Sequence, residues 1–131
     1  MKHANFIYLL ITMLFIGGCV TAKDPATLSD SRILHAIGGT YDNIYYQANK
    51  EPFIEEALKR NLIREEKLGD IRSSRISHGM TLNEVIASWG FYQNINRDYY
   101  EFGTRTQIVY NSAYIYLTDG FVSSISTRSR Y

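Results

Sequence analysis

Few residues of this chain could carry out nucleophilic, acid–base or metal chemistry. It contains one cysteine, Cys19, and only two of its three histidines, His35 and His78, follow that cysteine. Neither histidine has a second histidine or a cysteine at the spacing of a zinc site. The acidic pairs Glu55-Glu56 and Glu65-Glu66 are adjacent, so on a helix their side chains point about 100° apart and form no carboxylate dyad. We therefore expect no catalysis, no metal and no cofactor.

The residues before Cys19 are typical of an exported protein. Lys2 makes the start of the chain basic, and residues 6–16 form an uncharged, mostly apolar run. This run is shorter than the roughly 20 residues of a membrane-spanning helix. A basic start, an apolar run and small residues after it describe a secretory signal peptide. Because the chain has one cysteine, Cys19 has no partner for an intramolecular disulfide and needs another explanation.

The stretch Ile16-Gly17-Gly18-Cys19 resembles the bacterial lipobox. The resemblance implies signal cleavage between Gly18 and Cys19, a diacylglycerol on the Cys19 sulfur, and an acyl group such as palmitate on the new amino terminus. Several acyl chains anchor a protein almost permanently, because each buried CH₂ contributes about 0.8 kcal/mol. Val20, by similarity to lipoproteins of Gram-negative bacteria, implies sorting to the outer membrane. The alternatives are an ordinary signal peptide with an incidental cysteine, or a buried structural thiol.

The charge of the expected mature chain excludes one class of partner. Lys2 is the only one of the 14 basic residues that precedes Cys19, so 13 basic residues remain against 13 acidic ones. No basic patch stands out, and nucleic-acid binding requires one to neutralise phosphates. We therefore expect no nucleic-acid partner. The hydrophobic content of 45% and charged content of 21% are typical of one folded domain.

The chain divides into four segments. Residues 1–18 are expected to be the lipoprotein signal peptide, and residues 19–30, which are small and polar, a lipidated tether. Residues 31–74 are expected to be helical, with one helix over 31–37 that Gly38-Gly39 ends. In the same segment Pro52 opens a second helix, whose apolar stripe comprises Phe53, Ile54, Ala57, Leu58 and Leu62.

A third helix begins the last segment, residues 75–131. Thr81 and Glu84 have the spacing of a capping box, and Met80 and Val85 that of a hydrophobic staple. Gly90 is expected to end this helix in a left-handed conformation.

The hydrophobic period changes to two after residue 90, which predicts strands. Asp119-Gly120 and Asn111-Ser112 are expected to be two-residue hairpin turns. The expected strands are 107–110, 113–118 and 121–126, with an earlier one within 95–102. The predicted fold class is α+β, with N-terminal helices packed on a three- to four-stranded antiparallel β meander.

The turns also set which residues share a face of the sheet. The face expected against the third helix carries Ile108, Tyr110, Ala113, Ile115, Leu117 and Val122. The opposite face is expected to carry Gln107, Val109, Tyr114, Tyr116, Phe121, Ser123 and Ile125.

We take Val109, Tyr114, Tyr116 and Phe121 as candidate protein-binding residues, because tyrosine combines apolar area with a hydroxyl and is enriched in interfaces. This patch of aromatic residues could extend to Tyr99, Tyr100 and Phe102. The alternative is that residues 41–68 pack over this face and complete a second core.

The order of motifs in residues 75–127 resembles a known family. These motifs are His78-Gly79-Met80-Thr81, Glu84-Val85, Trp89-Gly90, Gln107…Tyr110, and Leu117-Thr118-Asp119-Gly120 followed by Val122 and Ile125. They are similar to the GMT…EV…LG signature, the aromatic strand and the closing F-x-D-G-x-V hairpin of the BamE (SmpA/OmlA) family of outer-membrane lipoproteins. The chain departs from that family at Phe91-Tyr92, where a proline is usual, and at Asn111-Ser112, which replaces a long loop.

The resemblance implies two helices on a three-stranded antiparallel sheet, a fold that also occurs in β-lactamase-inhibitor proteins. It implies a non-catalytic protein-binding or structural module, accessory to outer-membrane protein assembly or envelope integrity, whose partner is an envelope protein. The alternative on the same fold is a periplasm-facing inhibitor or a small-ligand-binding lipoprotein. An envelope enzyme would instead need a perturbed acid–base group in a cleft.

Overall fold

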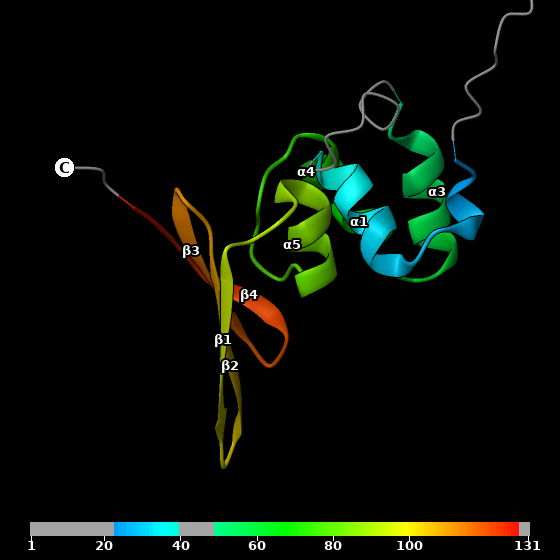
Figure 1. The fold of residues 1–131 in the computed structure, drawn as a ribbon. Coiled ribbons are helices and arrows are strands. Elements are labelled where there is room, and N and C mark those ends of the chain that lie inside the picture. Colours follow the sequence, from blue (N-terminus) through cyan, green and yellow to red (C-terminus); the bar gives the residue numbers. More distant parts are fainter. Residues whose placement is uncertain (1–22, 40–48, 129–131) are drawn as a thin grey trace, which may run out of the picture.

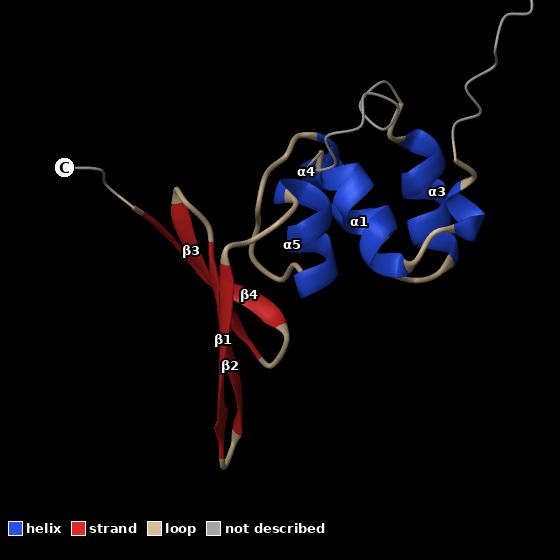
Figure 2. Ribbon diagram, viewed as in Figure 1, coloured by secondary structure: helices blue, strands red, loops and turns tan. Residues whose placement is uncertain are grey.

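The computed structural model describes residues 23–39 and 49–128, which form an α+β fold with the helices before one antiparallel sheet (Figure 1 and Figure 2). The predicted fold class is therefore confirmed. Gly18 and Cys19, the predicted cleavage and lipidation residues, lie outside the described ranges. The helices are α1 (Asp30–Gly38), α3 (Glu51–Lys59), α4 (Leu68–Arg72) and α5 (Leu82–Trp89), with 3-10 turns η1 (Pro25–Thr27) and η2 (Glu65–Lys67). The strands are β1 (Asn94–Tyr100), β2 (Gly103–Val109), β3 (Ala113–Thr118) and β4 (Phe121–Thr127).

The sheet is a meander in which each strand pairs with the next in the order β1-β2-β3-β4. Both predicted turns are present. Asp119 and Gly120 have φ of 50° and 88°, the positive values that a type I′ hairpin requires. Across Asn111-Ser112, the N–H of Tyr110 donates to the carbonyl of Ala113 at 2.9 Å. Strand β2 starts at Gly103, four residues before the predicted start.

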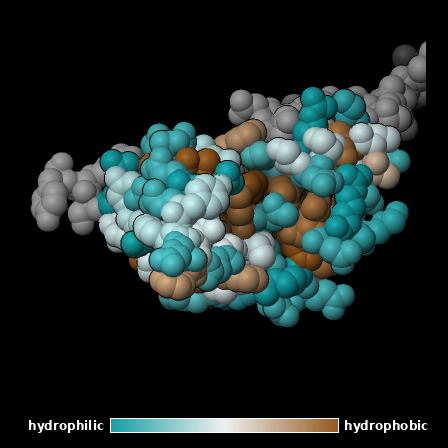
Figure 3. All heavy atoms as spheres, turned by 90° about the horizontal axis from the view of Figure 1, so that it is seen from below, coloured by the Kyte–Doolittle hydropathy of each residue, from teal (hydrophilic) through white to brown (hydrophobic). Residues whose placement is uncertain are grey.

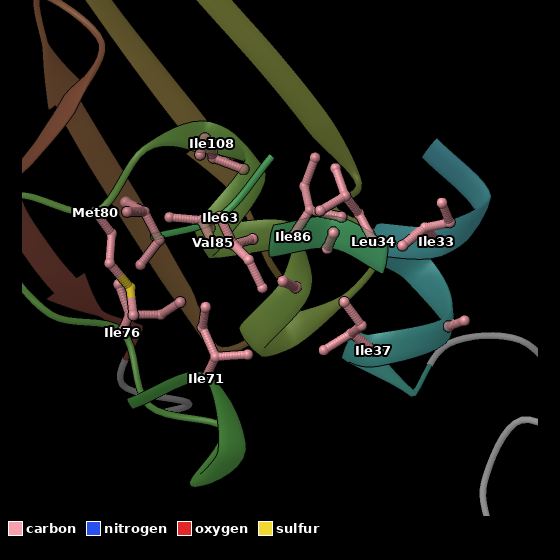
Figure 4. Packing of buried hydrophobic residues seen from close by; sticks show 14 of the residues in the cluster. Ile33, Leu34, Ile37, Ile63, Ile71, Ile76, Met80, Val85, Ile86 and Ile108 are labelled. Carbon is pink, nitrogen blue, oxygen red and sulfur yellow. The ribbon is translucent and has the colours of Figure 1, made fainter. Parts of the chain in front are cut away.

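All described helices lie on one side of the sheet (Figure 1). Helix α5 is nearest to the sheet, α1 packs on α5, and α3 packs on α1. Figure 4 shows Ile33, Leu34 and Ile37 of α1 on one side of Val85 and Ile86, and Ile108 of β2 on another. One hydrophobic cluster runs from Leu28 to Val122, so the predicted segments 31–74 and 75–131 fold around a common core.

The predicted core face of the sheet is confirmed, with one correction. All six residues expected there are buried, namely Ile108, Tyr110, Ala113, Ile115, Leu117 and Val122. Ile125 was predicted on the opposite face, but it lies opposite Ile115 and packs against the core. A register shift between Tyr116 and Leu117 inserts one extra residue in β4, and one extra residue moves every later side chain to the other face.

Helix α5 begins as predicted. The side chain of Thr81 accepts from the N–H of Glu84, and the Glu84 carboxylate accepts from the N–H of Thr81, which together form the capping box. Met80 is fully buried. The predicted left-handed conformation of Gly90 is wrong, because its φ of 76° is combined with a ψ of −143°. In this extended conformation the chain leaves the helix for β1, and the Gly90 carbonyl accepts from the Tyr110 hydroxyl at 3.0 Å.

The predicted tether, residues 19–30, includes residues that belong to the fold. Turn η1 is followed by Leu28, which is only 6% exposed. The Arg60 guanidinium donates to the Leu28 carbonyl at 2.8 Å and pairs with Asp30 at 2.9 Å. These contacts join the residues from η1 onward to the end of α3, because a side chain 30 or more positions later supplies their hydrogen-bond donors.

Helices α1 and α5 approach each other closely at two glycines. A Cβ on Gly38 would lie 2.6 Å from the Cα of Gly90 and nearer still to the carbonyl oxygen of Ile86. These obstacles are backbone atoms, so no side-chain rotation could relieve the clash. Gly38 therefore sets the distance between the two helices, while Gly39 ends α1 in the left-handed conformation (φ 76°).

We expect Gly38→Ala to destabilise the fold by about 3 kcal/mol, the upper part of the range for overpacking, because two backbones must move apart. Urea unfolding followed by far-ultraviolet circular dichroism measures this change. Gly69→Ala is the matched control, since a Cβ there meets nothing within 4 Å and alanine favours a helix by up to about 1 kcal/mol. Equal stability of the two variants would contradict the close contact between α1 and α5.

Candidate binding surface on the open sheet face

The face of the sheet opposite the helices, here called the open face, is not covered by any described helix (Figure 1). Strand register places Asn96, Asp98, Tyr100, Arg105, Gln107, Val109, Tyr114, Tyr116 and Thr118 on it. The alternative that residues 41–68 cover this face finds no support in residues 49–68. Helix α3 packs on α1, and Ile63 lies in the core beside Val85 on the helical side (Figure 4). Residues 40–48 lie outside the described ranges.

Two tyrosines on the open face each lie beneath an arginine. The guanidinium carbon of Arg105 is 5.4 Å from the ring centre of Tyr116, and that of Arg128 is 5.0 Å from the ring centre of Tyr114. Both distances are within the roughly 6 Å of a cation–π interaction. The predicted pair Tyr114 and Tyr116 is thus brought together on one face, as their spacing of two residues requires. Arg105 was not among the predicted binding residues. The alternation of the strand could have identified it, because it lies two residues before Gln107, which was predicted on this face.

A chain of side-chain hydrogen bonds crosses three strands beside Arg105. The Asn96 amide donates to the Gln107 side-chain oxygen at 3.0 Å, and the Gln107 amide donates to the Tyr116 hydroxyl at 3.0 Å. These residues are cross-strand neighbours. Together with Asp98 and Arg105 they line a cleft of about 250 Å³. The chain of hydrogen bonds fixes the orientation of both amides and leaves the Tyr116 O–H free to donate toward the cleft.

The other predicted binding residues differ in their positions. Val109 lies opposite Tyr114 on the open face and is half-buried. Phe121 is 49% exposed and lies opposite Thr118 of the open face in the register, beside the β3–β4 turn. Its backbone bridges to Thr81, and its ring centre is 5.8 Å from the guanidinium carbon of Arg64, which belongs to the helical part. Val109, Tyr114 and Tyr116 are therefore close neighbours on the open face, and Phe121 lies at the end of this face, where the sheet meets the helical part.

The β1–β2 hairpin carries the most exposed aromatic side chains of the described chain. Tyr99, Tyr100 and Phe102 are 77%, 57% and 91% exposed, and the hairpin tip projects away from the helices (Figure 1). Tyr100 and Phe102 line a second cleft that also includes Arg105. Part of the predicted aromatic extension therefore adjoins the open face through this arginine, whereas Tyr99 points to the other face.

The underside of the molecule has a different surface. Figure 3 shows apolar side chains gathered in the middle of that side, between the sheet and the helical part, with polar side chains around them. The open face combines aromatic rings with arginine and amide groups instead. Of these two surfaces of the described chain, the open face is the one that presents oriented hydrogen-bond donors beside aromatic rings, the combination typical of a specific binding surface.

Among residues 23–39 and 49–128, the most deeply buried charged group is the carboxylate of Glu84, which is fully buried. Arg64 donates to it from Nε at 2.8 Å, from Nη2 at 2.7 Å and from its backbone N–H at 3.0 Å, and Thr81 N–H donates at 2.8 Å. Burial is the largest influence and raises the pKa of Glu84, but these hydrogen bonds together outweigh it and hold the pKa below its usual value. The four hydrogen bonds occupy the oxygens of the Glu84 carboxylate and favour its ionised form, so this group is part of the packing of the helical part.

The two histidines have different surroundings. His35 is buried, its ring stacks on Phe91 at a centroid distance of 3.6 Å, and its Nδ1 lies 2.6 Å from the Ser31 carbonyl. Burial is the largest influence and lowers the pKa of His35, although the hydrogen bond with the Ser31 carbonyl opposes it. His78 is exposed in the turn before α5. Within residues 23–39 and 49–128, no three His, Cys, Asp or Glu side chains gather as a metal site.

We expect Glu84→Gln to destabilise the fold by about 2 kcal/mol at neutral pH, because it leaves the Arg64 charge without its buried partner. The lowered pKa stabilises the fold above the ordinary glutamate value of about 4.3, and this contribution is lost as pH falls through the folded-state pKa. The difference between the variant and the natural chain should therefore shrink in acid. Thermal unfolding at several pH values measures it.

Glu66→Gln is the control for this experiment. Glu66 pairs with the same guanidinium at 2.7 Å, but its side chain is 66% exposed, and exposed ion pairs contribute little. Equal losses at both positions, or a Glu84 loss that is independent of pH, would contradict the assignment of Glu84 as the buried partner.

The helices of the described chain and its comparison with known proteins bear on its class. In the described part of the chain, no helix has the length and apolar character needed to cross a bilayer. Protein-family models, curated protein sequences and solved structures include none that matches this chain.

Proposed function

We propose that this chain is a lipid-anchored lipoprotein of the bacterial outer membrane that acts, without catalysis, as a docking module for an envelope protein. Membership in the BamE family and a role as an accessory to outer-membrane protein assembly or envelope integrity are parts of this proposal. The observation that carries it is the open face, on which Tyr114 and Tyr116 each lie under an arginine and which no described helix covers.

The chemistry of this face favours protein docking. Tyrosine and arginine are enriched at protein interfaces, and residues of these types contribute most of the binding energy when they are centrally placed. The two tyrosines are already half-buried by their arginines and neighbours. Their rings therefore have restricted motion before a partner binds, which reduces the entropy that binding must remove.

The ionisable groups of the described chain support a non-catalytic role. A catalytic acid or base needs a perturbed pKa and access to a substrate. Glu84 and His35 have perturbed pKa values but are buried in the helical part. The pKa values of Glu51 and Asp70 are also lowered, but hydrogen bonds to neighbouring side chains on the surface of the helical part cause this. The clefts of the sheet lie on the opposite side and contain none of these residues.

Photo-crosslinking tests the docking proposal. Benzoylphenylalanine at Tyr116 should give one dominant protein adduct in native envelopes, because this ring lies at the centre of the open face. The same group at Lys59 is the control, since that side chain is 77% exposed on α3 in the helical part. The same adduct from both positions, or an adduct from Lys59 alone, would contradict docking through the open face. Identification of a barrel-assembly protein in the Tyr116 adduct would support the accessory role.

The anchor has a separate test. Cys19→Ala should move the chain from the membrane pellet to the soluble periplasmic fraction, because the variant lacks the sulfur that accepts the lipid. Metabolic labelling with radioactive palmitate should label the natural chain and not the variant. An unlabelled natural chain, or a variant that stays in washed membranes, would refute lipidation at Cys19.

The cleft beside Arg105 favours one further candidate, a lipoprotein that binds a small polar ligand. Its volume of about 250 Å³ lies just below the roughly 300–1,000 Å³ of common ligand pockets, so a ligand would have to be small. Native mass spectrometry of the chain purified from envelopes would detect such a ligand as a constant added mass, which Gln107→Ala should remove.

A further inference from the structure

We propose that the open face binds an acidic segment of its protein partner in extended conformation, with two carboxylates two residues apart directed at Arg105 and Arg128. This inference rests on the proposed docking function and names the chemistry of the partner. It follows from the contacts of the two guanidiniums, whose flat sides pack on tyrosine rings while their N–H donors have no acceptor among the described residues.

The two arginines differ from four of the five arginines that the structure describes in the helical part, Arg32 of α1 being the exception. Arg60, Arg64, Arg72 and Arg75 each form an ion pair with a carboxylate. Arg105 and Arg128, in contrast, make no ion pair with any residue in 23–39 or 49–128, and each packs over a tyrosine ring.

Packing over a ring occupies only the flat side of a guanidinium. The N–H groups lie in the plane of the group and point outward from its edges, so they remain available to a carboxylate in the bidentate geometry that arginine favours. The tyrosine also restricts the motion of the side chain. Each guanidinium is thus held over a ring while its N–H donors have no acceptor within residues 23–39 and 49–128.

Polar groups beside Arg105 in the cleft could also bind parts of an acidic peptide. The hydrogen bonds run from Asn96 to Gln107 and from Gln107 to Tyr116, so the Tyr116 hydroxyl proton is available to a ligand acceptor. Asp98 is the one acidic residue that lines the same cleft. It lies opposite Arg105 in the register without an ion pair to it. A peptide suits both kinds of group, because its side-chain carboxylates accept hydrogen bonds and its backbone N–H groups donate them.

The spacing of the two tyrosines gives the spacing in the partner. Tyr114 and Tyr116 lie two residues apart on β3, which separates them by about 7 Å along the strand. An extended peptide repeats its own side chains on one side with the same period. Carboxylates at positions i and i+2 of the partner therefore match the two arginine–tyrosine pairs, whereas carboxylates at i and i+3 point to opposite sides.

The test uses the full-length lipidated chain in detergent and three rhodamine-labelled hexapeptides of alanine. The first has glutamate at positions 2 and 4, the second at positions 2 and 5, and the third has glutamine at positions 2 and 4. Fluorescence anisotropy should show saturable binding of the first peptide and at least about fivefold weaker binding of the others, as expected for the loss of a charge-assisted hydrogen bond. Equal binding of the glutamine peptide would overturn the proposal.

Variants of the chain test the same contact. Arg105→Gln should weaken binding of the first peptide at least about fivefold, and the double variant with Arg128→Gln should abolish it. Arg97→Gln is the matched control, because Arg97 is exposed on the edge strand β1 but lies on the other face. Melting temperatures of all variants report whether they fold. Equal effects of Arg105→Gln and Arg97→Gln in folded proteins would refute the site.

Two further measurements separate the possible outcomes. Inorganic phosphate at constant ionic strength should displace the peptide only weakly; strong displacement would make the arginines a phosphate site, such as one for lipid headgroups, and reject the acidic peptide. Crosslinking from Tyr116 in the Arg105→Gln chain separates this inference from the docking function. An undiminished adduct, together with absent peptide binding, would leave docking in place and refute an acidic partner segment.

Discussion

One buried carboxylate joins the start of α5 to the loop that carries Arg64, and through its neighbours to the sheet. Glu84 caps its own helix by accepting from Thr81, and it accepts from the backbone and side chain of Arg64, twenty positions earlier. The same guanidinium also donates to the Gly79 carbonyl at 2.6 Å. Burial of one charge would be unfavourable by several kcal/mol, but a partner in good geometry with every lone pair satisfied offsets that cost. Three separate segments thereby meet at one point.

The connection from this point to the sheet is equally direct. The N–H of Gly79 donates to the carbonyl of Val122, and the N–H of Val122 donates to the carbonyl of Met80, both at 2.8 Å. The residues that lead into α5 therefore extend the sheet at the start of β4. Residues 79–84 thus fix the positions of the first turn of α5, the loop that carries Arg64 and the sheet relative to one another. The helices consequently occupy one face of the sheet and leave the other open.

The features of the fold that depend on local interactions could be predicted from the sequence. The spacing of Thr81 and Glu84 predicts the capping box, and Asp119-Gly120 predicts the hairpin, because each requires only interactions between residues a few positions apart. The bulge that moves Ile125 to the core face was not predictable, since no glycine or proline marks it. The contacts of Arg60 and Arg64 also escaped prediction, because their partners are chosen by packing between distant segments.

The candidate site was predicted in part for the same reason. Period-two alternation placed Tyr114 and Tyr116 on one face, and this prediction needed only the turn between β2 and β3. The alternation also placed Phe121 opposite Thr118 correctly, but it could not predict that the Phe121 ring lies near Arg64, a residue of the helical part. The same alternation could have identified Arg105, but a charged side chain on an exposed strand resembles an ordinary solvated residue until its tyrosine neighbour is known.

The contacts of Arg60 with the first described turn have a mechanical consequence. If Cys19 carries the proposed anchor, residues 20–24 alone separate the lipid from turn η1, an extended reach of about 17 Å. Any pull between membrane and domain would then act first on the hydrogen bonds from Arg60 to the Leu28 and Ala26 carbonyls. Release of these hydrogen bonds would lengthen the segment between the lipid and the folded domain when the two are pulled apart.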